Sequence, residues 1–325
     1  MAASPAIPAV AVRQLPARLT ALPAVPDIQT DPNRMTAGER RASFSLAAIF
    51  ALRMLGLFLV LPVFALEARR YPGGDDAALV GLAMGVYGLT QALLQIPLGM
   101  ASDRWGRKPV ILLGLALFAL GSGVAAWAPS VQWLVAGRAI QGAGAISAAV
   151  TAFLADVTRD SVRTKAMALV GISIALMFAL SLVLAPVLAA QIGLHGIFML
   201  TAALALTGMA VVAWVVPPEP AQQRDAGRGG LREVLTHAGL LRLDFGVFAL
   251  HAVQLSMWMA VPAVLVQAGL AAGQHWQVYL PAVLLSFLIM GGVLFRLERK
   301  GHLRVVFLFS IALIVAVQLG FLALG

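Results

Sequence analysis

The chain has 325 residues, of which 61% are hydrophobic and only 11% are charged, and its mean hydropathy is +0.91. This composition excludes a soluble globular domain and indicates a membrane protein with several spanning helices. A net charge of +9 can indicate nucleic-acid binding, but we expect no nucleic acid because the basic residues follow a membrane-topology pattern. The chain has no cysteine, and its five histidines lack helical metal-ligand spacing, so we predict neither a metal nor a cofactor.

Hydropathy divides the chain into a tail, two groups of spans and a linker. Residues 1–42 are rich in Ala and Pro, and we predict a disordered tail without a signal peptide. Residues 43–216 are predicted to form a six-helix bundle, 217–242 a cytoplasmic linker, and 243–325 the first three helices of a second bundle. The predicted spans are 43–66, 77–100, 110–127, 131–154, 166–190, 194–216, 245–269, 275–295 and 303–324. The fold class is therefore an all-α polytopic membrane bundle.

The distribution of basic residues predicts which side of the membrane each segment faces. Most of the 23 Lys and Arg residues lie in the tail, in the linker, or around the turns after the second, fourth and eighth spans. Only Arg69 and Arg70 fall in a predicted outer loop. Because basic loops stay in the cytoplasm, the pattern predicts a cytoplasmic amino terminus.

The short polar turn at residues 99–109 carries the most specific pattern in the chain. It reads Gly-Met-Ala-Ser-Asp-Arg-Trp-Gly-Arg-Lys-Pro between two long apolar runs. Asp103 and Arg107 are four residues apart and can pair on a helical turn. Asp156, near the end of the fourth span, is a candidate partner for Arg107 or Arg104. A basic turn that only fixes topology is the alternative interpretation.

This turn resembles the loop between the second and third helices of the major facilitator superfamily, with the pattern Gly-x-x-x-Asp-Arg-x-Gly-Arg-Lys. In the fourth span, Arg-Ala-Ile-Gln-Gly-Ala-Gly at residues 138–144 resembles the superfamily pattern Arg-x-x-Gln-Gly-x-Gly. In the fifth span, the Gly-Pro-x-x-Gly-Gly pattern of its proton antiporters is softened to Ala-Pro-Val-Leu-Ala-Ala at residues 185–190. The resemblance extends to its bacterial drug–proton antiporters and implies two six-helix bundles.

The resemblance also implies roles for individual residues. The polar turn would act as a conformational gate that latches the cytoplasmic ends of the two bundles, and small residues and a proline would serve helix packing. The gate residues are Gly99, Asp103, Arg104, Gly106, Arg107, Lys108 and Asp156. The packing residues are Gln141, Gly142, Gly144 and Pro186, and Pro186 is expected to kink the fifth span.

An internal repeat with an offset of 192 residues supports the two-bundle interpretation. It aligns Val86-Tyr87 with Val278-Tyr279, and it places the glycine and the basic residues of the turn on Gly291, Arg296, Arg299 and Lys300. Chance similarity between two basic loops is the alternative.

Two cations, Arg53 and Arg138, lie within predicted spans. Because a charge at that depth is costly in lipid, each should face the bundle interior or water. In the superfamily, an arginine at the position of Arg138 is linked to proton coupling. Binding of backbone carbonyls is the alternative for Arg138, and extension to the cytoplasmic interface is the alternative for Arg53.

The sequence does not clearly indicate which residue carries the proton, because none of the 14 Asp and Glu residues lies deep in a span. His251 is the candidate, with a purely structural histidine as the alternative. Tyr87 with Gln91, and His251 with Gln254, share helix faces by their spacing. The predicted cavity residues are therefore Arg53, Arg138, His251, Tyr87, Gln91 and Gln254, although the glutamines could instead bond between helices.

The resemblance implies a secondary active transporter of the bacterial inner membrane, not an enzyme, that exports small amphipathic molecules in exchange for protons by alternating access. Its partners would be a small-molecule substrate, protons and the lipid bilayer. The alternative is a truncated membrane protein that does not transport. With nine of the superfamily's twelve spans, the chain as written is expected not to perform coupled transport.

Overall fold

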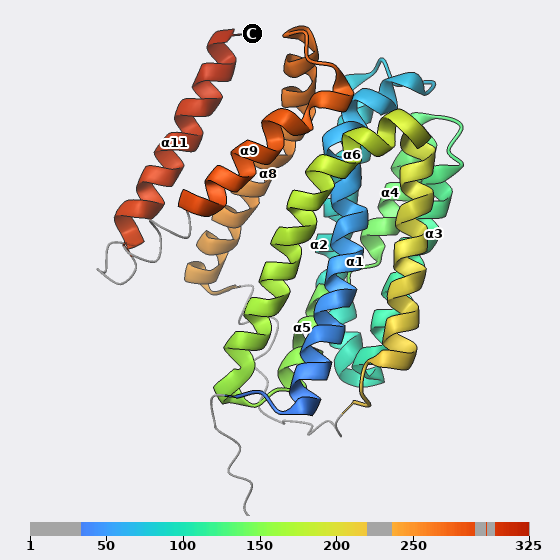
Figure 1. Cartoon of the computed structure of the whole chain (residues 1–325), viewed down its shortest axis with the longest axis vertical. Coiled ribbons are helices and arrows are strands. Elements are labelled where there is room, and N and C mark those ends of the chain that lie inside the picture. Colours follow the sequence, from blue (N-terminus) through green and yellow to red (C-terminus); the bar gives the residue numbers. More distant parts are fainter. Residues whose placement is uncertain (1–33, 220–235, 290–296, 298–302, 325) are drawn as a thin grey trace, which may run out of the picture.

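The computed structural model describes residues 34–219, 236–289, 297 and 303–324. All regular secondary structure in these ranges is helical (Figure 1). Seven of the described helices are long and apolar enough to cross a membrane. The structure therefore confirms the predicted all-α membrane bundle. The predicted disorder of residues 1–33 and most of the predicted linker, residues 220–235, lie outside the described residues.

The first three predicted spans are helices α1 (Ala37–Glu67), α2 (Ala77–Trp105) and α3 (Arg107–Ala126). A short 3-10 turn, η1 (Ala68–Arg70), follows α1. Helix α1 begins before the predicted start at residue 43 because Thr36 and Glu39 cap each other's backbone N–H groups. The last residues of the predicted disordered tail, 37–42, are therefore helical.

The fourth predicted span is interrupted, which corrects the continuous helix expected over residues 131–154. Helix α4 (Val131–Ala143) ends at Gly144, and α5 (Ser147–Asp156) begins after a gap of non-helical residues. Gly144 has φ −75° and ψ +44°, so its carbonyl leaves the helical direction. A broken helix inside a membrane needs other partners for its freed backbone groups.

The fifth and sixth spans join in α6 (Asp160–Ala210), which ends in a π-helical turn, η2 (Val211–Val215). The residue that leaves helical geometry is Gly193, with φ +62°, a value that favours glycine. Gly193 falls between the predicted fifth and sixth spans, and Pro186 lies inside the arm that corresponds to the fifth span. A proline removes one backbone donor, but its own φ still fits a helix.

The remaining described helices are α8 (Ala238–Gln267), α9 (Trp276–Ile289) and α11 (Leu303–Leu324), with a 3-10 turn, η3 (Ala272–Gln274), between the first two. Helix α8 begins before the predicted residue 245 because the His237 ring accepts the N–H of Leu240 and caps it. The repeat-related residues Gly291, Arg296, Arg299 and Lys300 lie outside the described residues.

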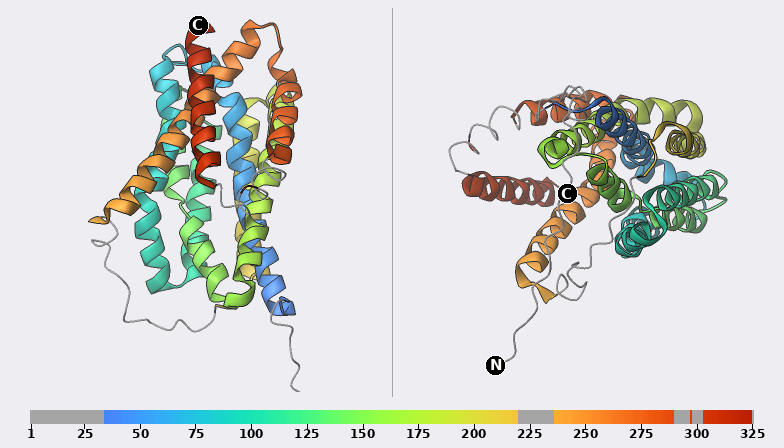
Figure 2. Two further views of the ribbon diagram at one scale, coloured as in Figure 1. Left: turned by 90° about the vertical axis from the view of Figure 1, so that its left-hand side faces the viewer. Right: turned by 90° about the horizontal axis from the view of Figure 1, so that it is seen from below.

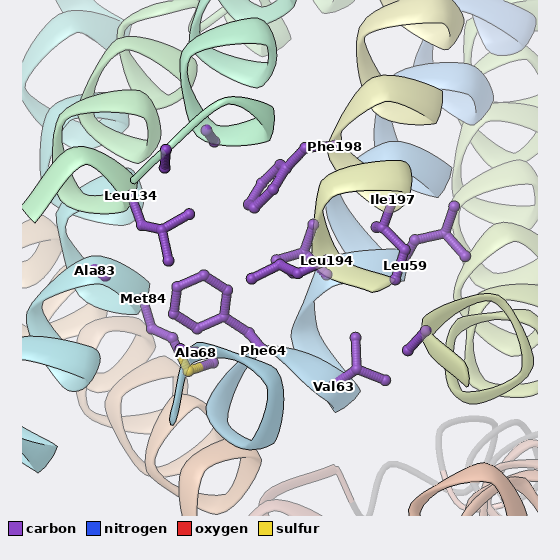
Figure 3. Packing of buried hydrophobic residues seen from close by; sticks show 14 of the residues in the cluster. Leu59, Val63, Phe64, Ala68, Ala83, Met84, Leu134, Leu194, Ile197 and Phe198 are labelled. Carbon is purple, nitrogen blue, oxygen red and sulfur yellow. The ribbon is translucent and has the colours of Figure 1, made fainter. Parts of the chain in front are cut away.

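Helices α1 to α6 form one tightly packed bundle, and α8, α9 and α11 lie along one side of it (Figures 1 and 2). Helix α1 packs along α6, α4 packs against α2 and α3, and α8 reaches α1 and α2. The core towards one end contains Leu59 and Phe64 of α1, Met84 of α2, Leu134 of α4 and Phe198 of α6 (Figure 3). In a soluble protein, burial of each such side chain stabilises the fold by about 1.5–3 kcal/mol. Within a bilayer the helices are instead held together mainly by van der Waals packing.

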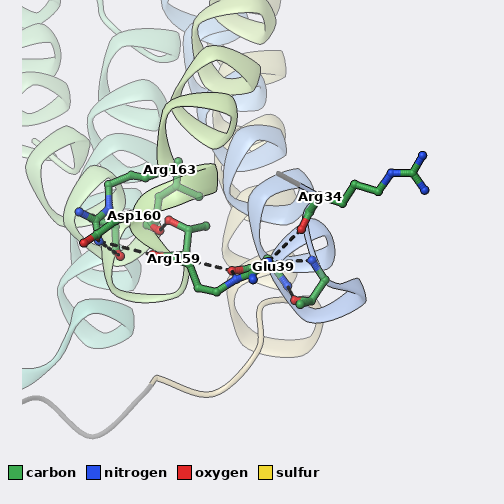
Figure 4. Close-up of polar contacts among 9 residues, drawn as sticks. Arg34, Glu39, Arg159, Asp160 and Arg163 are labelled. Carbon is green, nitrogen blue, oxygen red and sulfur yellow. Dashed lines mark hydrogen bonds and ion pairs between the residues drawn. The ribbon is translucent and has the colours of Figure 1, made fainter. Parts of the chain in front are cut away.

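At the opposite end of the bundle, polar contacts join the segments that were predicted to be cytoplasmic. Arg159, at the start of α6, donates its Nε to Glu39 at 2.8 Å and its Nη2 to the backbone carbonyl of Arg34, also at 2.8 Å (Figure 4). Arg163 pairs with Asp160 one turn later. The start of α1 and the turn between α5 and α6 therefore face the same side, as the predicted topology requires.

Candidate functional site

The polar turn forms an ion-pair network centred on Arg107. The Arg107 guanidinium lies 2.6 Å from Asp103, and its Nε lies 2.9 Å from Asp156 at the end of α5. It also donates to the Ser102 hydroxyl at 2.7 Å. The Arg107 side chain is only 7% exposed, so its charge is shielded by these partners. The network joins α2, α3 and α5 at the end of the bundle that is predicted to be cytoplasmic.

Glu219 is a partner that sequence reasoning missed. Its carboxylate accepts the backbone N–H of Arg107 at 2.8 Å and also that of Lys108. The Lys108 ammonium in turn donates to the carbonyl of Val216 at 2.7 Å. Glu219 thus caps the positive end of α3 and holds the start of the linker against the turn. Its only sequence signal is a carboxylate after Pro217-Pro218, which does not reveal a partner more than a hundred residues away.

The other predicted gate residues surround this network. Gly106 has φ +99° and allows the tight turn between α2 and α3. The carbonyl of Gly99 accepts the Ser102 hydroxyl, and a Cβ at Gly99 would meet the side chain of Ala148 in ordinary contact. Arg104 is exposed and is therefore the member of the set that faces away from the network.

Replacing Glu219 by alanine is expected to destabilise the start of α3 by about 1 kcal/mol, as the loss of other helix caps does. Because the linker would also lose its anchor, limited proteolysis after residue 219 should become faster. Glu219→Gln is the matched control, since the amide oxygen can still accept one backbone N–H. Equal proteolysis rates in Glu219→Ala and the original chain would show that the cap does not restrain the linker.

Arg53 donates a hydrogen bond to a backbone carbonyl at the break in the fourth span. Its Nη2 donates to the carbonyl of Gly144 at 3.2 Å, to the Tyr87 hydroxyl at 3.1 Å and to Gln91 Oε1 at 3.4 Å. The side chain is fully buried and is located 5.3 Å from the centroid of the Phe118 ring. It therefore does not extend to the cytoplasmic interface, which was the alternative for this residue. The sequence marked Arg53 as intramembrane but gave no indication that it binds an interrupted helix.

Arg138 lies in the same polar cluster. Its Nη1 donates to Gln141 Oε1 at 2.9 Å, and its guanidinium is 4.6 Å from the centroid of the Tyr87 ring. Gln141 Nε2 in turn donates to the Ser122 hydroxyl at 2.7 Å. Both arginines are thus held by neutral groups and aromatic faces, which compensate a buried cation only in part.

The packing residues near this cluster permit close helix contact. A Cβ at Gly142 would overlap the Thr90 hydroxyl and the carbonyl of Tyr87, and one at Gly144 would overlap the carbonyl of Gly114. Pro186 is buried in α6. The two glycines therefore let α4 approach α2 and α3 closely enough to form the arginine cluster.

A cavity of about 830 Å³ is lined by α1, α2, α4 and the first arm of α6 on one side and by α8 and α9 on the other. It brings together five of the predicted cavity residues: Tyr87, Gln91, Arg138, His251 and Gln254. Arg53 is not on the cavity wall but lies behind Tyr87 and Gln91, to which it donates. The His251 ring nitrogen Nδ1 donates to the carbonyl of Val247 at 2.8 Å.

One wall of the cavity is aromatic, which the sequence did not indicate. Phe58 of α1 stacks edge-to-face with Phe178 of α6, Phe178 with Trp258 of α8, and Trp258 with Tyr279 of α9, with ring centroids 5.1, 6.0 and 5.6 Å apart. Phe58, Phe178 and Trp258 line the cavity, and Tyr279 extends the row to a fourth helix beyond the lining residues, so no local sequence pattern could reveal it. A cavity with an apolar aromatic wall and a polar wall suits a small amphipathic molecule.

Comparisons with known proteins agree with this architecture. A family model described as Major Facilitator Superfamily matches residues 44–325. The inner membrane transport protein YajR of Escherichia coli (strain K12) is 45% identical over 290 residues, which cover 88% of this chain and 64% of that protein. An uncharacterized transporter of Buchnera aphidicola subsp. Acyrthosiphon pisum (strain APS) is 34% identical over 267 residues, 81% of this chain and 68% of that protein. This chain thus spans about two thirds of the length of these relatives.

More distant matches extend the comparison. The class B tetracycline resistance protein of Escherichia coli is 32% identical over 172 residues, 51% of this chain and 42% of that protein. A bacterial homologue of the human lysosomal transporter Spinster has a TM-score of 0.63 at 17% identity, covering 82% of this chain and 64% of its own. A D-xylose–proton symporter has a TM-score of 0.57 at 15% identity, covering 79% and 69%. These two structures share the fold.

Proposed function

Because this chain belongs to the major facilitator superfamily and is a multi-pass membrane protein, we propose that it serves proton-coupled efflux of small amphipathic molecules. The observation that carries the proposal is the cavity between the first bundle and α8, with a polar wall and an aromatic wall. In this fold the substrate site lies between the two bundles, and their rocking exposes it to each side in turn. The tetracycline resistance relative supports the direction of transport.

In this proposal one group of residues acts in the cavity and a second group acts at the cytoplasmic end of the bundle. His251 is the candidate proton carrier because it lines the cavity and carries an imidazole, the side-chain type that most often serves as a proton shuttle. Arg138 lines the same cavity and would supply a fixed positive charge there, which disfavours a second positive charge on a protonated histidine. Arg107, with Asp103 and Asp156, forms the gate network, which would hold the cytoplasmic ends together in one state and release them in the other.

The test is dye transport in proteoliposomes under an imposed pH gradient. Two proteins are compared: the 325-residue chain, and the same chain extended by the corresponding remainder of the Escherichia coli relative. We expect the extended protein to move a lipophilic dye in response to the gradient, and Arg138→Ala to abolish that response. Gradient-independent dye movement, or a response unchanged in Arg138→Ala, would contradict the proposal. The unextended chain, tested in parallel, decides whether these residues alone transport.

The orientation of the chain is a separate prediction, for which we propose a cytoplasmic amino terminus. The chain has no cysteine, so single cysteines report without background. Asp75 lies in the exposed loop before α2, and Asp160 lies at the opposite end with an 89% exposed side chain. In intact cells, an impermeant thiol reagent should label Asp75→Cys at least about tenfold faster than Asp160→Cys, because the bilayer blocks the second site. The reverse order would invert the topology.

A further inference from the structure

We propose that the cavity selects amphipathic molecules that carry an anionic group, with Arg138 as the residue that binds the anion and Arg53 as the charge behind it. The inference rests on the proposed function only in using the same cavity. It concerns binding, which is measured without transport. The observations that carry it are charge balance, free donors and the shape of the cavity walls.

The charge balance of the cavity is positive. Among its lining residues there is an arginine and a histidine but no aspartate or glutamate. Within the described ranges, the ion pairs lie near the helix ends, at Glu39, Glu67, Asp103, Asp156 and Asp160, and none includes Arg53 or Arg138. Two buried guanidinium groups, 0% and 2% exposed, therefore lack a carboxylate partner in the described part of the chain.

Both guanidinium groups also keep unused donors. In the described structure, Nε of Arg138 has no hydrogen-bond partner, and neither do Nε and Nη1 of Arg53. A guanidinium presents its donors in a planar fork that matches the oxygens of a carboxylate or sulfonate. Leaving such donors unpaired in a buried site is costly, so an anionic ligand that approaches Arg138 would satisfy what the protein alone does not.

The aromatic wall of the cavity indicates the chemistry of the remaining part of the ligand. Phe58, Phe178 and Trp258 form an apolar aromatic surface on the same cavity. The volume of about 830 Å³ is within the range of cavities that hold drug-sized molecules. A molecule with an aromatic body and one anionic group can therefore stack on this wall and reach Arg138. A cationic amphiphile of the same shape would meet two uncompensated positive charges.

The experiment uses two naphthalene dyes of nearly identical shape. 8-Anilinonaphthalene-1-sulfonate is an anion, and N-phenyl-1-naphthylamine is the same ring system without the sulfonate. The full 325-residue chain is placed in nanodiscs of zwitterionic lipid, and binding is measured by energy transfer from its tryptophans, with empty discs as the correction for partitioning. We expect the sulfonate to bind roughly tenfold more tightly, which corresponds to about 1.4 kcal/mol.

Substitutions test whether Arg138 causes the preference for the sulfonate. Arg138→Gln should remove the advantage of the sulfonate, and Arg138→Lys should keep part of it. Arg70→Gln is the matched control, because Arg70 is an exposed arginine paired with Glu67 in the loop after α1, and it should leave both affinities unchanged. If Arg138→Gln does not fold, the comparison of the two dyes on the unmodified chain still decides. Equal affinities for the two dyes, or a sulfonate preference that survives in Arg138→Gln, would overturn the inference. Transport could fail in vesicles while this preference persists, so the two proposals are tested separately.

Discussion

Replacing Arg107 by alanine is expected to lower the free energy of unfolding by about 1.5–3 kcal/mol, because a buried cation that hydrogen-bonds two partly exposed carboxylates is lost. The Arg107 guanidinium is the cation that lies between Asp103 and Asp156, at 2.6 and 2.9 Å. Without it, two carboxylates face each other at the end of the bundle, and the Ser102 hydroxyl loses its donor. The gate network would therefore change from attraction to repulsion.

The measurement is thermal or denaturant unfolding of the purified chain, with a triple variant as the key comparison. In Arg107→Met combined with Asp103→Asn and Asp156→Asn, the repulsion disappears, so much of the stability should return. Because both carboxylates share one cation, the single Asp→Asn changes should be non-additive by about 0.5–3 kcal/mol. Arg104→Ala, which removes an exposed cation of the same turn, should have little effect. An Arg107→Ala variant as stable as Arg104→Ala would show that the network is not a structural unit.

The span pattern could be predicted from the sequence because a bilayer imposes a simple requirement on it. Runs of apolar residues must be long enough to cross about 30 Å of hydrocarbon, and this is visible in one dimension. The helices over residues 77–105 and 107–126 therefore agree closely with the prediction. The start of α1 was less accurate, because the cap at Thr36 and Glu39 extends the helix beyond the apolar run.

What could not be predicted depends on contacts between distant segments. The break at Gly144 lies in a sequence that was predicted to be one continuous span, and the carbonyl of Gly144 accepts a hydrogen bond from Arg53 of α1. Glu219 caps a helix that begins far earlier in the chain. The aromatic wall likewise needs three helices, α1, α6 and α8. Patterns of three or four residues identified single polar residues, whereas the partners of those residues became visible only in three dimensions.

Replacing Arg53 by alanine is expected to destabilise the protein by about 3 kcal/mol, because it combines a cavity with a buried backbone acceptor left unpaired. The acceptor is the carbonyl of Gly144 at the break between α4 and α5, which Arg53 binds at 3.2 Å. Tyr87 and Gln91 also lose a donor, but both line the cavity, where water can replace it. The cost is therefore concentrated at the interrupted helix, and hydrogen exchange of residues 144–150 should become faster than in the original chain.

Two further substitutions separate charge from packing at the same position. Arg53→Met removes the buried charge together with its desolvation cost and fills most of the space, so its stability should lie between those of the original chain and Arg53→Ala. Arg53→Lys keeps the charge but cannot place one planar group against Gly144, Tyr87 and Gln91 together. If Arg53→Met were as unstable as Arg53→Ala, loss of the bonds to the broken helix would dominate. If all three variants matched the original chain in stability and in exchange at residues 144–150, Arg53 would not hold the break, because water entering from the cavity could then satisfy the Gly144 carbonyl equally well.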